Sequence, residues 1–144
     1  MADYKQLKTI TIGGETFGLV EGLGVLQTKN TSKLPYTGGW VDTDTITLEK
    51  DQTYLVGVLG TFATGDTTGI MRHSVKITTS FGAHQEITLD ANQASVQKST
   101  WRVFTPSIDN YTVYASAESS KAISGGVGVQ VSLNVVKLLR IPTT

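Results

Sequence analysis

The sequence contains no cysteine, only three prolines and few charged residues. Without cysteine, the chain has no disulfide, no thiolate zinc site and no thiol nucleophile, so packing alone must hold the fold together. Charged residues make up 17% of the 144 residues and the formal net charge is zero, whereas an average soluble domain has roughly 25% charged residues. A partner recognised mainly by charge, such as nucleic acid, is therefore not expected.

Long apolar runs are also absent. The first ten residues, MADYKQLKTI, lack the apolar segment of a signal peptide. No stretch approaches the ~18 consecutive apolar residues that a membrane helix needs. We therefore expect a chain made in the cytosol, with no membrane insertion.

Threonine and glycine are abundant instead, with 22 and 15 copies. The branched Cβ of threonine suits extended backbone, and its hydroxyl tolerates water on the half-wet face of a sheet. The composition thus indicates a β protein of one ordinary domain.

The N-terminus predicts a β-hairpin. Residues 7–12 alternate apolar and polar side chains, Gly13-Gly14 supplies two positive-φ turn positions, and residues 15–20 form the returning strand. Residues 28–39 read as an exposed loop. We therefore predict an attachment segment over 1–33 and a β-sandwich domain over 34–144.

Further strands are predicted by alternation and by buried apolar runs, separated by Gly, Asp and Asn turns. Val127 to Ile141 changes phase near Val135, which predicts a β-bulge. Asp90 is predicted to cap one helical turn. The predicted fold is all-β: an antiparallel β-sandwich, jelly-roll-like, with about eight strands and an N-terminal β-hairpin. The strands of the sandwich are expected near residues 46–48, 54–62, 70–79, 86–89, 101–104, 111–116 and 127–141.

Candidates for catalysis or metal binding are scattered. His73 lies on an apolar strand face, where a core imidazole is the common outcome, and His84 has only Glu86 as a nearby ligand-forming neighbour. Asp42 and Asp44 are spaced as in some calcium loops, yet such a pair is common in turns. No catalytic or nucleotide-binding motif occurs. We therefore expect no catalytic residue, no metal and no cofactor.

Aromatic residues give better binding candidates. Tyr36 and Trp40 flank a Gly-Gly pair in the predicted loop, where an aromatic face can stack on a sugar ring or contact a partner. Packing of this loop against the sandwich is the alternative. Trp101 opens a predicted strand and is expected to seal the end of the core.

The N-terminal order of features supports a resemblance. The segment LKTITIGGETFGLVE resembles the N-termini of small virion structural proteins of phages and prophages, of the tail, fibre or capsid-decoration type. The resemblance rests on about 20 residues and implies that this hairpin pairs with a neighbouring subunit, with Ile10, Ile12, Phe17 and Leu19 in the assembly contact. It also implies a location in the virion and contacts with other virion proteins.

Three hypotheses for function follow. The first is a phage virion structural protein that is not an enzyme, forms a homo-oligomer with a trimer favoured, and contacts the host surface, for example a surface glycan. Unpaired strand edges and apolar patches make a monomer prone to aggregate, whereas they become interfaces in an oligomer, so they support assembly. The second is a carbohydrate-binding β-sandwich module that uses Tyr36 and Trp40. The third is a small β-sandwich enzyme built around His73, His84 and Glu86.

Overall fold

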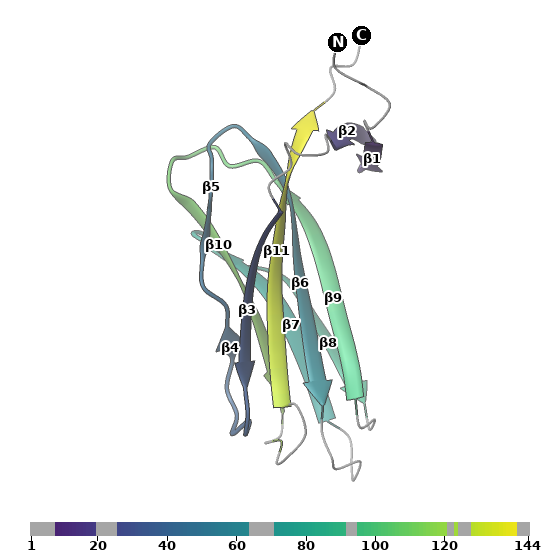
Figure 1. Cartoon of the computed structure of the whole chain (residues 1–144), viewed down its shortest axis with the longest axis vertical. Coiled ribbons are helices and arrows are strands. Elements are labelled where there is room, and N and C mark those ends of the chain that lie inside the picture. Colours follow the sequence, from purple (N-terminus) through teal and green to yellow (C-terminus); the bar gives the residue numbers. More distant parts are fainter. Residues whose placement is uncertain are drawn as a thin grey trace.

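The computed structural model shows two antiparallel β-sheets packed face to face (Figure 1). It describes residues 8–19, 26–63, 71–91, 95–120, 123 and 128–140. The described residues contain no helix long and apolar enough to cross a membrane. The two antiparallel sheets confirm the predicted all-β antiparallel sandwich. Its strands are β1 (Lys8–Ile12), β2 (Glu15–Leu19), β3 (Leu26–Lys33), β4 (Val41–Asp42), β5 (Ile46–Leu48), β6 (Thr53–Ala63), β7 (Met71–Thr79), β8 (Gly82–Ala91), β9 (Ser95–Phe104), β10 (Tyr111–Ser119) and β11 (Gly128–Arg140).

The first sheet has β11 and β6 at its centre, flanked by β3 and β9. Alternate residues of β11 point into the sandwich and are almost fully buried: Val129, Val131, Leu133 and Val135. Their neighbours on the opposite face, from Gln130 to Val136, are at least partly exposed. This period-two pattern fixes which face of the first sheet meets the core and which meets solvent.

The second sheet has the order β4-β10-β7-β8, and β5 also pairs with β10, further along the strand than β4. Val113, Ala115 and Ala117 of β10 face the core and are fully buried, as are Val75 and Ile77 of β7. These side chains meet the inner face of the first sheet and form one hydrophobic core. The core supplies the rigid support on which both outer faces rest.

The N-terminal hairpin has the predicted turn. Gly13 and Gly14 have φ angles of 59° and 80°, which glycine adopts without steric cost. β2 pairs with only the last two residues of β11, Leu139 and Arg140, so the hairpin lies at the far end of the long strands (Figure 1). The side chains of Ile10, Ile12, Phe17 and Leu19 lie outside the described part of the chain. Their assembly role therefore stays a prediction.

The loop predicted over residues 28–39 is wrong for its first half. Leu26–Lys33 forms β3, which pairs with β11 from Val129 to Val136. Polar residues suit this strand because it lies at the edge of the sheet, pairs with β11 alone among the described strands, and exposes most of its side chains to solvent. The division between residues 33 and 34 falls at the end of β3, and the two-part domain organisation stays a prediction.

Two further local predictions are wrong. β11 pairs with β6 in one unbroken register from Gly128 to Leu138, so there is no bulge near Val135. The apolar residues change face near the end of β11, because Val135 is buried on the inner face of the sheet whereas Leu138 is buried on the outer face. The helical turn predicted from Asp90 is not found where the chain is described: Asp90 and Ala91 belong to β8, and the chain is again a strand from Ser95. Residues 92–94 lie outside the described part.

His73 lies inside the core, as the pattern of β7 predicts, and it is fully buried. Its ring stacks on Phe62, with the ring centroids 4.4 Å apart. Neither ring nitrogen has a hydrogen-bond partner among the residues that the structure describes. Burial lowers the pKa of His73, and the positive charge of Lys98 adds to the effect. The imidazole is therefore neutral in the native state at neutral pH.

We expect acid to destabilise the fold through His73. The folded-state pKa is lowered, so the unfolded chain takes up the proton first, and stability falls as the pH drops below the unfolded value of about 6.5. His73→Phe should reduce this pH dependence between pH 7 and the folded-state pKa. Urea denaturation at several pH values measures it. An identical pH profile in the variant and the native chain would contradict the assignment.

Candidate functional site

Tyr36 is a core residue. Its side chain is 1% exposed. The carbonyl oxygens of Gly39 and Ser119, 2.7 and 3.0 Å from the hydroxyl, share its one proton, and the hydroxyl oxygen accepts from the amide of Ser119 at 3.0 Å. Burial raises the pKa of Tyr36. A ring covered in this way cannot stack on a sugar, so the packing alternative holds for Tyr36.

Trp40 is only partly exposed, and a lysine covers its ring. Nζ of Lys76 lies 3.8 Å from the ring centroid, over the outer side of the second sheet. Beside it, the hydroxyl of Ser116 donates to the carboxylate of Asp42 at 2.6 Å. Such a cation–π contact holds the indole in place. The predicted sugar contact of Trp40 stays a prediction, since Lys76 would have to move before a ring could stack there.

The structure does not bring the proposed catalytic residues together. His73 pairs across the sheet with Leu89, whereas His84 pairs with Ile77. His84 is therefore opposite a residue four positions from His73 along β7, or about 13 Å away at the rise of a strand. The side chains of His84 and Glu86 lie outside the described part. Among the described residues, no three His, Asp or Glu side chains are close enough to hold a metal ion.

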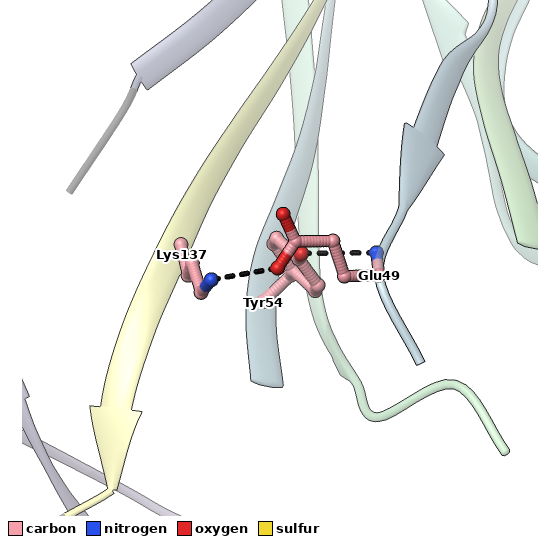
Figure 2. A network of polar contacts seen from close by, with 3 residues as sticks. All are labelled: Glu49, Tyr54 and Lys137. Atoms are coloured by element: carbon pink, nitrogen blue, oxygen red, sulfur yellow. Dashed lines mark hydrogen bonds and ion pairs between the residues drawn. The ribbon is translucent and has the colours of Figure 1, made fainter. Parts of the chain in front are cut away.

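A polar contact joins the two sheets at their open edge (Figure 2). Nζ of Lys137 on β11 donates to the carboxylate of Glu49 at 2.8 Å, and the amide of Glu49 donates to the hydroxyl of Tyr54 at 3.0 Å. The bond to Glu49 raises the pKa of Lys137. A cavity of about 170 Å³ lies beside it, which is smaller than typical ligand sites. Because both charged groups are exposed, the contact adds at most about 1 kcal/mol.

Trp101 forms a flat aromatic platform on the outer face of the first sheet. Its side chain is 48% exposed. It lies on β9 directly opposite Gly57 of β6. A Cβ at residue 57 would come within 2.3–2.5 Å of three carbons of the indole ring, so the ring lies on the bare glycine backbone. The expectation that Trp101 seals the end of the core is therefore wrong.

Polar groups extend the row that contains Trp101. Gly57 is also opposite Asn134 of β11, which is opposite Thr28 of β3. Oγ1 of Thr28 donates to Oδ1 of Asn134 at 3.1 Å. This bond fixes the amide two strands away from the backbone of Trp101, and one strand, or about 5 Å, away from Gly57, over which the indole lies. An aromatic face and an oriented amide therefore share one row.

The outer face around this row carries no charged side chain among the described residues. The registers of β3, β11, β6 and β9 place on it only hydroxyl, amide, aliphatic and indole groups, together with Gly57. We call these residues the neutral face: Thr28, Asn30, Ser32, Gln130, Ser132, Asn134, Val136, Leu55, Gly57, Leu59, Thr61, Gln97, Ser99, Trp101 and Val103.

The neutral face was not predicted from the sequence, although one signal for it was present. Gln97, Ser99, Trp101 and Val103 alternate with Val96, Thr100 and Phe104, and the latter three are buried. This alternation would have placed Trp101 on the solvent side of its strand. The position of Gly57 opposite the indole depends on the pairing of β6 with β9, which no local pattern gives.

No protein-family model and no curated protein matches the chain. Solved structures with a similar fold include a CBM4 module (15% identity, 94% of this chain and 78% of that chain, TM-score 0.36). A family 35 carbohydrate-binding module from Clostridium thermocellum (13%, 90% and 87%, 0.36) is also similar. So is the C-terminal CBM6 of the marine laminarinase LamC from Zobellia galactanivorans (14%, 92% and 90%, 0.37). The likeness extends to the fold alone, and these similar structures are carbohydrate-binding modules rather than virion proteins.

Proposed function

We propose that this chain is a non-catalytic domain that binds uncharged carbohydrate on its neutral face. The observation that supports this most directly is the half-exposed indole of Trp101, which lies flat on Gly57 among hydroxyl and amide side chains. A pyranose ring has an apolar C–H face that packs on an aromatic ring, and it has hydroxyls at its rim. Asn134 lies in the same row, where it can meet those hydroxyls.

The absence of charged side chains on the neutral face favours an uncharged ligand. An uncharged sugar does not require a buried ion pair, and hydroxyl and amide groups both donate and accept hydrogen bonds, as sugar hydroxyls do. A ligand that carries sulfate or carboxylate groups would find no cation among the described residues of this face. The proposed carbohydrate contact is therefore Trp101, in place of Tyr36 and Trp40.

A second copy of this chain is the competing occupant of the neutral face. The centre of a protein interface is poor in charge and rich in tryptophan, and Leu55, Leu59 and Val103 are half-buried beside Trp101. The two occupants predict different results. Sugar binding leaves the mass in solution unchanged on Trp101→Ala, whereas a self-interface dissociates in that variant.

Gly57→Ala tests the platform without removing the indole. The new Cβ would overlap ring carbons of Trp101, so the exposed indole must swing off the sheet, and we expect saccharide affinity to fall at least about fivefold. The fold should be retained, because alanine is less costly than glycine inside a strand and the displaced ring faces solvent. Calorimetric titration and circular dichroism measure the two effects. Unchanged affinity would contradict the flat platform.

We also propose, as a second candidate role, that the N-terminal hairpin attaches the domain to a larger assembly such as a phage virion. Support comes from β2, which pairs with only two residues of β11, and from β1, which pairs with β2 alone among the described strands. Such an edge accepts a strand from another subunit.

We expect the full chain to be a multimer and a chain lacking residues 1–19 to be a monomer. The shortened chain keeps β3, whose eight residues belong to the first sheet, so it should fold. Light scattering gives both masses. A full-length monomer would contradict assembly through the hairpin, and a multimer of equal size in both chains would assign assembly to another surface.

A further inference from the structure

A polar hollow lies on the neutral face at some distance from the indole. It has a volume of about 350 Å³ and is lined by Asn30, Thr31, Ser32, Gln130, Val131 and Ser132. Its outward-facing pairs are Gln130 with Ser32 and Ser132 with Asn30, across β11 and β3. The volume falls within the roughly 300–1,000 Å³ range of small-molecule sites. The hollow is therefore large enough to hold a ligand group.

The hollow and the indole are too far apart for one sugar ring. Ser132 is two residues from Asn134 along β11, and Trp101 is two strands away from Asn134. Because the indole lies over Gly57, the spacing between strands and the rise along a strand together give a separation on the order of 12 Å from the ring to the middle of the hollow, between Asn30 and Gln130. A single pyranose ring does not span this distance, whereas several linked rings do.

The chemistry between the two points is continuous. Asn134 lies between the indole and the hollow, held by its bond from Thr28, and Ser132 and Ser99 occupy the next row with Leu59. The amides of Asn30 and Gln130 each offer donors and an acceptor to sugar hydroxyls. Within the described residues no charge interrupts this path.

We infer that the neutral face takes an uncharged oligosaccharide of three or more rings, with one ring on Trp101 and a later ring in the hollow between Asn30 and Gln130. This inference rests on the proposed carbohydrate function and adds the length and the second contact of its ligand. The neutral face thus distinguishes a polysaccharide chain from a monosaccharide or a single terminal sugar.

The test is a titration of the full chain with cello-, xylo- and manno-oligosaccharides of one to six units. We expect affinity for the bound series to rise with length and then level off after three or four units. The double variant Asn30→Ala with Gln130→Ala should lose at least about tenfold in affinity for the hexamer. It should bind the dimer as the native chain does. Trp101→Ala should weaken binding at every length.

Equal affinity for all lengths, or full hexamer affinity in the double variant, would overturn the inference. The proposed function would survive that outcome if Trp101→Ala still weakened binding. If the native chain bound no member of any series, both the function and the inference would fail. If the double variant melts at a lower temperature, Ser32→Ala serves as a milder second variant in the hollow. It should also reduce the gain in affinity with oligosaccharide length, but by less.

Discussion

Trp101→Ala is expected to weaken saccharide binding at least about tenfold, a loss of ~1.4 kcal/mol in binding free energy. The substitution removes the only exposed aromatic face that the structure places on the neutral face. Stacking of this kind contributes on the order of 1 kcal/mol beyond the area that it buries. The measurement is calorimetric titration of both proteins with the saccharide that binds the native chain best.

The matched control is Trp40→Phe, since the chain has two tryptophans. Trp40 lies on the other sheet, under Lys76, so its replacement by another aromatic should leave binding unchanged. Trp101→Ala should also keep its fold, with a cost of about 1–2 kcal/mol for the half-buried ring. The opposite result, in which the Trp40 variant loses binding and the Trp101 variant binds fully, would contradict the assignment. It would place the binding site on the second sheet.

Tyr36→Phe is expected to destabilise the fold by about 1–3 kcal/mol. The variant keeps the ring in the core but removes the hydroxyl that pairs with the amide and carbonyl of Ser119 and the carbonyl of Gly39. These backbone groups then lose a partner, and a buried unpaired group costs more than the bond itself contributed. Urea denaturation, read as a lower midpoint at unchanged slope, measures the loss.

Tyr114→Phe is the matched control for the Tyr36 variant. Tyr114 is half-buried on β10 and points away from the core, between the inward-facing Val113 and Ala115, so its replacement should change stability by less than about 0.5 kcal/mol. Saccharide binding should be retained in both tyrosine variants. A Tyr36→Phe protein of native stability that no longer binds sugar would show that Tyr36 contacts the ligand after all.

Local patterns predicted those parts of the fold that depend on one strand at a time. Alternation along β7 placed His73 and Val75 on the inner face, and Gly13-Gly14 specified the hairpin turn, because both features are set by neighbouring residues. The polar edge strand β3 was missed, because its sequence resembles a loop and it becomes a strand only by pairing with β11. Tertiary pairing overrode the local signal there.

The candidate site was harder to predict, because it depends on contacts between distant parts of the chain. Tyr36 is buried by a segment 83 residues away, at Ser119, and Trp101 lies flat because Gly57 of another strand has no side chain. Neither relation has a signature in a short window of sequence. Aromatic residues in a glycine-rich stretch therefore directed the sequence-based prediction to Tyr36 and Trp40 rather than to Trp101.

The most direct test of carbohydrate binding at the neutral face uses the Trp40→Phe protein, in which Trp101 is the single tryptophan. Its fluorescence is recorded while uncharged oligosaccharides of three to six units are added, and light scattering follows the mass. Binding at this face predicts a saturable change in the emission of Trp101 at constant mass, which is lost in the additional Gly57→Ala variant. Two results together would contradict carbohydrate binding at this face: no saccharide alters the emission, and the protein is a multimer that dissociates when Trp101 is replaced. They would identify the neutral face as a self-interface.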